Sequence, residues 1–373
     1  MEITAGELNS LDKDKYILVD IRIESDREYG CIPGSISLSA KELLDAPPKA
    51  EAKKLIIYCE RGVLSESAAH ELRKRGYDAY SLKDGYVNWL LNEISIRKAS
   101  EEEVCQKAER SIRKKYRKEL MTPFIRALNT YRLVNDKDRI CVCISGGKDS
   151  MLMAKLFQEL KRYSKVDFEV EYAVMDPGYA AENRRIIEDN AEVLGVPIKI
   201  FESSIFDTVF NIEKNPCYLC ARMRRGYLYR YARELGCNKI ALGHHYDDVI
   251  ETILMGMLYG AQIQTMMPKL HSTNFEGMEL IRPMYFVRED DIKAWRDYSG
   301  LHFIQCACRF TDTCSTEGKS SSKRLEIKKL IRQLKLSNPD VEKTIFRSVE
   351  NVHLDTVIAY KKDGIKKHFL DEY

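Results

Sequence analysis

The 373-residue sequence lacks any long hydrophobic run, and this excludes a membrane-spanning helix. Its most apolar stretch, residues 249–261, is short and contains Glu251. The N-terminus lacks the basic start and the apolar run of a secretion signal. Repeats and low-complexity segments are also lacking, and 19 glycines and 10 prolines are ordinary for a globular protein, which excludes a fibrous or disordered chain. We therefore expect a cytoplasmic protein of two domains that is not associated with a membrane.

Cysteine, by contrast, is abundant, with 11 residues. In a reducing compartment these cysteines are not expected to form a disulfide framework, so catalysis, metal binding and simple burial are the competing roles. Their number is odd and their spacing is clustered. This pattern favours a chemical role for some of them.

The net charge of +3 is unevenly distributed along the chain. Residues 1–97 carry a net charge of −3, so the remainder carries +6. The excess is concentrated in three basic runs, at residues 107–118, 222–233 and 323–335. Such runs are either solvated helix faces or a surface that binds a polyanion, and composition leaves both interpretations open.

Short apolar segments alternate with helical ones in two regions of the chain, which predicts an α/β fold with parallel strands. In residues 1–97 we expect strands at 16–20 and 55–58 and a helix at 65–75. Residues 98–120 are charged and helix-prone, which predicts a connecting helix. From residue 139 we expect strands at 140–144, 168–175, 198–201 and 239–242, and helices at 149–163, 181–194, 217–235 and 247–258. Ligands of such sheets bind at the carboxyl ends of the strands.

Cys59 ends one of the predicted strands and is followed by a short loop and a helix. Loop amides and the positive end of a helix lower the pKa of a thiol and stabilise a bound anion, as a thiolate or persulfide requires. A buried structural cysteine at a strand end would have the same local sequence.

The surrounding sequence resembles the rhodaneses, a family of sulfurtransferase modules, over nearly all of residues 1–97. The resemblance is carried by Leu18-Val-Asp-Ile-Arg22, Tyr29-Gly-Cys-Ile-Pro-Gly-Ser35, Tyr58-Cys-Glu-Arg-Gly-Val-Leu-Ser65, Gly76-Tyr77 and Gly85-Tyr-Val-Asn-Trp89. It implies that Cys59 is catalytic and carries a persulfide cradled by residues 60–64. Cys31 stands where the family commonly has histidine, and we interpret that position as structural.

The string Ser145-Gly-Gly-Lys-Asp-Ser150 follows an apolar strand and opens a helix. Its glycines allow close approach to phosphates, the helix N-terminus supplies amide donors and Lys148 adds a positive charge. The spacing is not that of a Walker loop. The full string is similar to the pyrophosphate-binding loop (PP-loop) of adenylating ATPases related to GMP synthetase, which implies ATP binding by Ser145, Gly146, Gly147, Lys148, Asp149 and Ser150.

A second string, Leu242-Gly-His-His-Tyr-Asp-Asp-Val-Ile-Glu-Thr252, leads from a strand into a helix. Asp247 or Asp248 could cap that helix, with Glu251 as the acid of a capping box. The same carboxylates suit Mg²⁺ or the positioning of an α-phosphate. We therefore expect Gly243, His244, Asp247 and Asp248 to contribute to ATP binding, and we expect Asp176, after the strand 168–175, to contact the adenosine.

Cys217 and Cys220 lie three residues apart at the start of a predicted helix, after Pro216. Such a Cys-x-x-Cys pair is typical of zinc sites, iron–sulfur sites and redox pairs alike. A second group, Cys306 and Cys308, lies at a strand end, where alternate residues point to opposite faces. Only one of these two is therefore expected to join the first pair.

From about residue 120 to 355 the chain resembles the tRNA 2-thiocytidine synthetases (tRNA-cytidine(32) 2-sulfurtransferases). The matches are the Ser145–Ser150 loop, residues 217–230 and 241–252, Tyr259-Gly260, Met267-Pro-Lys-Leu270, Ile281-Arg-Pro283 and Arg288-Glu-Asp-Asp-Ile292. The family holds a 4Fe–4S cluster with three cysteines, which implies Cys217, Cys220 and Cys306 as ligands here. The family usually has Cys-x-x-Cys at the third ligand, whereas this chain has Cys306-Ala-Cys308, and we prefer Cys306. Cys105, Cys141, Cys143 and Cys237 are expected to be packed thiols.

Together these resemblances imply a rhodanese-like domain at 1–97, a charged helical linker at 98–130 and a PP-loop domain at 131–373. The implied reaction adenylates the C2 oxygen of a cytidine with ATP and Mg²⁺ and then replaces that oxygen with sulfur. A cysteine desulfurase or another persulfide donor would load Cys59, an iron of the cluster with an open coordination site would hold the sulfur, and Arg222, Arg224 and Arg225 would position the tRNA. The sequence leaves open whether the protein forms a homodimer.

Three alternatives remain. The first is thiolation of another tRNA base or of a small molecule, because these motifs do not name the acceptor. The second is an adenylating amine ligase similar to the lysidine synthetases, which would need neither the rhodanese nor the cysteine trio. The third is an iron–sulfur or zinc sensor that has kept an ATP-binding fold.

Overall fold

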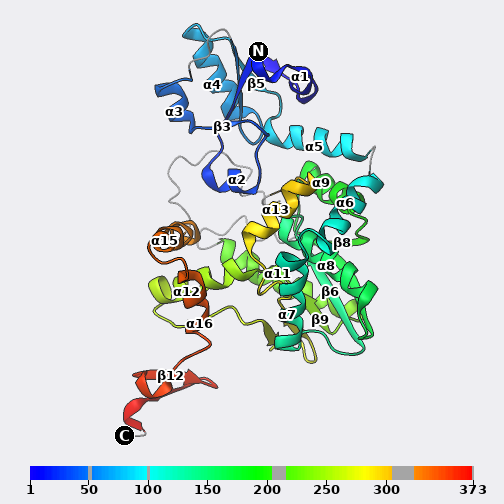
Figure 1. Cartoon of the computed structure of the whole chain (residues 1–373), viewed down its shortest axis with the longest axis vertical. Coiled ribbons are helices and arrows are strands. Elements are labelled where there is room, and N and C mark those ends of the chain that lie inside the picture. The colour runs from blue at the N-terminus through cyan, green and yellow to red at the C-terminus, as the bar shows by residue number, and fades with distance from the viewer. Residues whose placement is uncertain (49–52, 99–100, 204–215, 305–322, 372–373) are drawn as a thin grey trace. The chain divides into compact units, whose positions relative to one another are not determined.

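The computed structural model describes residues 1–48, 53–98, 101–203, 216–304 and 323–371 (Figure 1). The chain divides into two compact units. The first takes in Met1–His245 and Pro268–Gly318, and the second takes in Tyr246–Met267 and Lys319–Tyr373. Among the described helices, none combines the length and the hydropathy needed to cross a lipid bilayer.

The N-terminal part of the first unit is a five-stranded parallel sheet with the strand order β1-β5-β4-β2-β3. Its strands are β1 (Glu2–Ile3), β2 (Tyr16–Asp20), β3 (Ile36–Ser37), β4 (Lys54–Tyr58) and β5 (Ala79–Leu82). Its helices are α1 (Ala5–Ser10), α2 (Glu24–Tyr29), α3 (Ala40–Asp45), α4 (Val63–Lys74) and α5 (Gly85–Lys98).

The two predicted strands of this region are confirmed as β2 and β4, next to each other inside the sheet. Leu55, Ile56 and Ile57 are all fully buried. Because successive strand residues point to opposite faces, both faces of β4 are covered, as the continuous apolar run predicts. The predicted helix is confirmed as α4, whose Ala69 and Leu72 belong to the same core. Each fully buried Leu or Ile contributes roughly 1.5–3 kcal/mol through the hydrophobic effect.

A second sheet of the same unit has the order β10-β11-β9-β6-β7-β8, and only the pair β10–β11 is antiparallel. The strands are β6 (Asp138–Ile144), β7 (Phe168–Asp176), β8 (Ile198–Glu202), β9 (Lys239–Ala241), β10 (Lys269–His271) and β11 (Glu279–Ile281). The helices are α8 (Lys148–Tyr163), α9 (Ala181–Val193), α11 (Pro216–Glu234) and α13 (Glu289–Ser299).

The order of this sheet reverses at β6. From β6 the chain proceeds outward through β7 to β8, and it then returns to place β9 on the other side of β6. Residues Cys141 and Val142, which point to opposite faces of β6, are both fully buried, so the sheet is covered on both sides. The carboxyl ends of β6 and β9 therefore flank a topological switch point, which is where open α/β sheets bind ligands.

The charged connector predicted for residues 98–130 is helical but not continuous. It consists of α6 (Glu101–Arg113), a π-helical turn η2 (Arg117–Met121) and α7 (Thr122–Tyr131). Ala108 and Ile112 of α6 are fully buried, and α6 packs against α8, α9 and α13. Glu109 accepts hydrogen bonds from Lys155 Nζ and Arg162 Nη1, both at 2.8 Å. Although burial opposes it, this bonding lowers the pKa of Glu109 to about 2, so the inner face of α6 is tied down by charge as well as by apolar packing.

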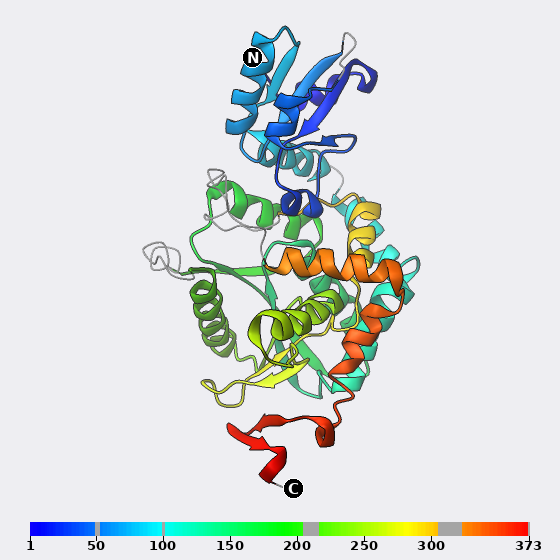
Figure 2. The same cartoon turned by 90° about the vertical axis from the view of Figure 1, so that its left-hand side faces the viewer.

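The second unit is built around α12 (Tyr246–Gly260), α15 (Lys323–Ser337) and α16 (Val341–Ser348), followed by the hairpin of β12 (Ala359–Lys362) and β13 (Ile365–His368). Figures 1 and 2 both show α12 beside α15 and α16. The ring of Tyr246 stacks on Phe346 with centroids 4.6 Å apart, and Lys335 Nζ lies 2.9 Å from Glu342 Oε2. These contacts join the three helices into one packed group.

Candidate functional site

The loop after β4 holds Cys59 at the N-terminus of α4. The Cys59 side chain is buried, and its Sγ lies 3.5 Å from Ser65 Oγ. The carbonyl groups of Cys59 and Glu60 accept hydrogen bonds from the amides of Tyr86 and Val87, at 2.9 and 3.2 Å. The loop is therefore fixed from outside, and its thiol faces the positive end of a helix, the setting that suits a persulfide anion.

Arg22 supports this loop, a role that the sequence alone did not indicate. Its guanidinium lies 2.8 Å from Asp20 Oδ2 and 3.4 Å from Glu60 Oε2, and it stacks 3.8 Å from the centroid of the Tyr86 ring. Burial raises the pKa of Glu60 and the Arg22 charge opposes that effect. Arg22 thus holds the first residue after Cys59 in place. The sequence signal that could have indicated this role is the string Leu18–Arg22, which is among the segments that resemble the rhodaneses.

The Ser145–Ser150 loop joins β6 to α8. The amide of Ser145 donates to Ser150 Oγ at 3.1 Å, and that hydroxyl donates to the carbonyl of Gly147 at 3.0 Å, which closes the loop on itself. Gly146 has φ +85°, a conformation that favours glycine. α8 begins at Lys148, so its first amides face the loop, where a helix N-terminus can bind phosphate.

Lys148 is the charged residue of this loop. Its side chain is buried, and Nζ lies 3.1 Å from Asp149 Oδ2 and 3.4 Å from Glu289 Oε1. Glu289 is the first residue of α13, so an element distant in sequence orients the lysine. Glu289 belongs to Arg288–Ile292, one of the segments that resemble the tRNA 2-thiocytidine synthetases, but the sequence does not predict its contact with the loop.

The loop after β9 meets the first loop at the switch point. A Cβ built on Gly243 would lie 3.3 Å from the amide nitrogen of Ser150, so any other residue at position 243 would push the two backbones a few tenths of an ångström apart. His245 Nε2 lies 3.9 Å from Asp149 Oδ1, a buried carboxylate oxygen that accepts no hydrogen bond from the described residues. Gly243 therefore lies beside the Ser145–Ser150 loop, and its contribution to ATP binding stays a prediction. His245 joins the site as an unpredicted member. His244 lies between them in the same loop.

The Gly146 backbone makes the first testable prediction. A Cβ at this position would lie 2.4 Å from Ile187 Cγ1, and φ +85° is strained for any other residue. We expect Gly146→Ala to displace the loop and to reduce ATP-dependent release of pyrophosphate by about 100-fold or more, the cost of an ångström-scale misplacement at a reacting centre. Gly6→Ala is the control, because a Cβ there meets nothing within 4 Å. Unchanged pyrophosphate release in the Gly146 variant would show that this loop does not hold the nucleotide.

Asp176 ends β7 at the same edge of the sheet, as predicted. Its Oδ1 accepts hydrogen bonds from the amides of Gly178 at 2.8 Å and Tyr179 at 2.6 Å, and its Oδ2 lies 3.4 Å from Arg184 Nη1. The carboxylate therefore shapes the turn that follows the strand. Contact of this residue with adenosine stays a prediction.

The expected capping role of Asp247 or Asp248 is wrong. α12 begins at Tyr246, so both aspartates lie inside its first turn and neither is the N-cap. Their negative charges there interact favourably with the positive end of the helix. They belong to the second unit, in which Asp248 Oδ1 lies 3.2 Å from Arg324 Nη1 and Glu251 Oε2 lies 3.3 Å from Arg324 Nε. Their role in binding Mg²⁺ or phosphate stays a prediction.

Positions 217 and 220 lie in the first turn of α11, which follows Pro216. The last residue of α11, Glu234, is near the start of β9, so the helix runs opposite to the strands and its first turn lies at their carboxyl ends. The pair Cys217 and Cys220 is therefore at the same edge of the sheet as the nucleotide loop. The side chains of these two residues, and Cys306 and Cys308 altogether, lie outside the described part of the structure.

The predicted tRNA-contacting arginines lie further along α11. Arg224 Nη2 is 3.4 Å from the hydroxyl of Tyr179, a residue of the turn after β7, and Arg225 is exposed. The side chain of Arg222 is outside the described set. At least Arg224 is thus placed at the carboxyl edge of the sheet.

Three of the four cysteines that were expected to be packed thiols are confirmed. Cys141, Cys143 and Cys237 are buried in one apolar cluster between the sheet and α11. Contacts among them and burial raise the pKa values of Cys141 and Cys237, which keeps both as neutral thiols. Cys105 is only half-buried, with its Sγ 3.7 Å from Lys155 Nζ, and Cys31 is exposed.

A short segment between α13 and Cys306 lies close to both loops of the first unit. Phe303 and Ile304 line a small cavity together with Arg22, Glu60 and Tyr86. Ile304 Cδ1 is also 3.3 Å from the Cβ position of Gly146. The loop that carries Cys59 and the nucleotide loop are therefore adjacent to one segment, whose last described residue stands two positions before Cys306.

Two known domain families match the parts of the chain that carry these two loops. The profile described as "PP-loop domain" matches residues 109–309, and that described as "Rhodanese-like domain" matches residues 4–92. A solved U34-tRNA thiolase NcsA from Methanococcus maripaludis, with its 4Fe–4S cluster, is 21% identical, with a TM-score of 0.48 over 61% of this chain and 76% of that one.

Curated relatives are more similar in sequence. The tRNA-cytidine(32) 2-sulfurtransferase of Vibrio vulnificus (strain YJ016) is 37% identical over 232 residues, which cover 61% of this chain and 71% of the relative. That of Neisseria meningitidis (serogroup C, strain FAM18) is 34% identical over 250 residues, covering 65% and 75%. The chain belongs to the PP-loop family and, within it, to the tRNA-cytidine(32) 2-sulfurtransferases, enzymes of ATP-dependent tRNA thiolation, with a rhodanese-like domain at its N-terminus.

Proposed function

We propose that this enzyme adenylates the C2 oxygen of a cytidine, at position 32 of tRNA, and replaces that oxygen with sulfur delivered from a persulfide on Cys59. The observation that carries the proposal is that three features lie at one edge of one sheet. These are the closed Ser145–Ser150 loop, the first turn of α11 with its cysteine pair, and the Phe303–Ile304 segment beside the Cys59 loop.

In the first half of the reaction ATP binds the Ser145–Ser150 loop. The amides at the start of α8 and the buried Lys148 hold the leaving pyrophosphate, and Glu289 orients the lysine. The C2 oxygen attacks the α-phosphorus, and the bond from that phosphorus to pyrophosphate breaks. Mg²⁺ fits this loop because Asp149 Oδ1 is a buried oxygen that accepts no hydrogen bond from the described residues. For Asp247 and Asp248 we keep the role in Mg²⁺ or phosphate binding that the sequence predicts.

In the second half sulfur displaces AMP. The Cys59 persulfide gives up its outer sulfur as hydrosulfide when a thiol reductant supplies two electrons, and Cys59 returns as a thiol. Hydrosulfide attacks C2 and the bond from C2 to the adenylated oxygen breaks, so that AMP leaves with the original oxygen. A cysteine desulfurase or a comparable persulfide donor would then reload Cys59.

The donor set suits a 4Fe–4S cluster. Cys217 and Cys220 stand one helical turn apart at the sheet edge that holds the nucleotide loop, and Cys306 follows the segment that contacts that loop. Bound there, such a cluster would supply a Lewis-acidic iron that could hold sulfide close to the activated base. Arg222, Arg224 and Arg225, on the same helix, would place tRNA phosphates so that an unpaired anticodon-loop base reaches the site.

Nucleoside mass spectrometry tests the proposed acceptor. Purified enzyme, prepared under anaerobic conditions, is incubated with unmodified tRNA, ATP, Mg²⁺ and sulfide, and the RNA is digested to nucleosides. We expect 2-thiocytidine as the product, and no product when position 32 is changed from cytidine to uridine. Appearance of another thiolated base, with no 2-thiocytidine, would contradict the proposed acceptor and leave the enzyme a thiolase of a different nucleotide.

A further inference from the structure

The outer side of α6 forms a groove with α13 that is separate from the nucleotide loop. The groove has a volume of about 460 Å³, and its lining includes Gln106, Lys107, Arg110, Lys114, Lys115 and Tyr298. Glu289, at the other end of α13, contacts Lys148. Tyr298 is nine positions after Glu289, so it lies about 14 Å along the helix from the residue that contacts Lys148.

The charges on α6 are balanced on one side only. On the inner side, Arg113 lies 3.9 Å from Glu109 Oε2 and 3.7 Å from Glu159 Oε1. On the outer side, Lys107, Arg110, Lys114 and Lys115 are exposed, and no described carboxylate lies within ion-pair distance of any of them. Glu103 is the one acidic residue in the groove lining.

This outer arrangement costs stability by itself. Lys107 and Arg110 are three residues apart on α6, and Lys114, the first residue after the helix, continues their row because its amide donates to the Arg110 carbonyl at 3.0 Å. Like charges at these spacings repel by a few tenths of a kcal/mol per pair. A solvated helix face normally intersperses acids among its bases. The run of four bases without a matched acid is therefore better explained by an anionic partner than by solubility.

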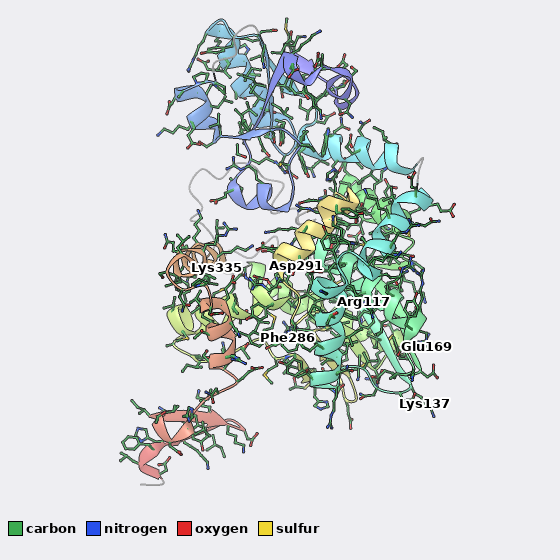
Figure 3. The ribbon with its side chains drawn as sticks, viewed as in Figure 1. Arg117, Lys137, Glu169, Phe286, Asp291 and Lys335 are labelled. Atoms are coloured by element: carbon green, nitrogen blue, oxygen red, sulfur yellow. The ribbon has the colours of Figure 1, made fainter. Side chains whose placement is uncertain are left out.

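An aromatic ring lies among these cations. Lys115 Nζ is 3.7 Å and Lys107 Nζ is 5.1 Å from the centroid of Tyr298, which is 40% exposed. The Tyr116 ring meets Tyr298 edge-on with centroids 5.8 Å apart, and the Tyr116 hydroxyl donates to the carbonyl of Ala294 at 3.1 Å. The ring thus holds the lysine side chains in a defined place and also presents a surface on which a base could stack. In Figure 3, Arg117 marks the continuation of the basic run beyond α6.

We propose that this groove binds the sugar–phosphate backbone of the tRNA, away from the nucleotide that is modified. The proposal deepens the proposed function, because it assumes that tRNA is the substrate and assigns it a second contact surface. Two cations on α6 and two in the turn that follows it match a polyanion, and a phosphate backbone releases counterions on binding them. An acidic protein, such as the persulfide donor, is the other partner that this charge would suit, and the experiment below separates the two.

The test compares two variants with the same change of net charge. In one, Lys107, Arg110, Lys114 and Lys115 are changed to glutamine, and in the other Lys13, Lys15, Lys41 and Lys83, exposed residues of the rhodanese-like domain, are changed to glutamine. We expect the groove variant to bind tRNA at least about tenfold more weakly near physiological salt, and its slope of log affinity against log salt to fall by about 3. We expect the KM for tRNA to rise. At saturating tRNA, both the rate of pyrophosphate release and kcat stay at the wild-type level. The control variant keeps the affinity and the slope.

Three results would overturn the proposal. The groove variant could bind tRNA with unchanged affinity and slope, the control variant could lose as much affinity as the groove variant, or the groove variant could lose sulfur loading from a cysteine desulfurase while its tRNA binding is intact. The last result would assign the groove to a protein partner. A failure of the proposed function would give a different result from a failure of this proposal. In that case the wild-type enzyme would bind tRNA through the groove and would form no 2-thiocytidine.

Discussion

A Cys59→Ala variant should lose tRNA thiolation driven by thiosulfate or a cysteine desulfurase and should keep thiolation driven by free sulfide. The reason is the position of this thiol. Cys59 is buried beside Ser65 at the N-terminus of α4, in a loop held by backbone hydrogen bonds from Tyr86 and Val87. This setting stabilises a persulfide, but free sulfide reaches the activated base without it. The measurement is 2-thiocytidine formation with each sulfur source in parallel.

The matched control is Cys31→Ala, because Cys31 is an exposed cysteine of the same domain. We expect this variant to behave as the wild type with every sulfur source. Equal loss of activity with donor and with free sulfide in the Cys59 variant would contradict the relay, since it would place Cys59 in the thiolation step itself or in the stability of the fold. If donor-driven thiolation were lost in the Cys31 variant and kept in the Cys59 variant, the thiol that transfers sulfur would be Cys31 and not Cys59.

Replacing Cys217 or Cys220 by serine should have an equally large effect of a different kind. We expect the broad visible absorption of the anaerobically purified protein to disappear and thiolation to stop with every sulfur source, free sulfide included. Pyrophosphate release should persist, because the Ser145–Ser150 loop and Lys148 belong to other elements of the sheet edge. Absorption spectra, iron and sulfide content and pyrophosphate release are measured on the same preparation.

The third ligand is tested alongside. Cys306→Ser is expected to remove the absorption, and Cys308→Ser is expected to leave it. The half-buried Cys105 provides the control position, since Cys105→Ser should preserve both the absorption and thiolation. Bleaching by Cys308→Ser, with the absorption kept in Cys306→Ser, would show that the ligand assignment is reversed. Full thiolation by a Cys217 variant would show that the cysteine pair is not part of the reaction.

Much of the fold follows from local sequence because its signals are local. The strands β4 and β6 are continuous apolar runs, and such runs occur where both faces of a strand are covered, as Ile56, Ile57, Cys141 and Val142 are. The loop after β6 was predictable in the same way, since Gly146 and the start of α8 define it within six residues. Helix boundaries are harder to predict. α12, for example, begins at Tyr246, ahead of the aspartates that were expected to cap it.

The contacts that assemble the site could not be predicted, because they join residues far apart in sequence. Lys148 meets Glu289, and Ile304 lies beside Gly146. Neither periodicity nor a short motif contains information about such pairs. The connector is a second example. Its charge pattern predicted a helix, but only the packing shows that Arg113 faces the paired side of α6, whereas Lys107 and Arg110 face the groove.

The central claim is that the enzyme adenylates the C2 oxygen of the target cytidine before sulfur replaces it. The most direct measurement follows that oxygen. A tRNA carrying ¹⁸O at C2 of the cytidine at position 32 is thiolated by the enzyme with unlabelled ATP, and the AMP is analysed by mass spectrometry. The account predicts one ¹⁸O atom in the phosphate of AMP for each 2-thiocytidine formed. Thiolated tRNA accompanied by unlabelled AMP would contradict it.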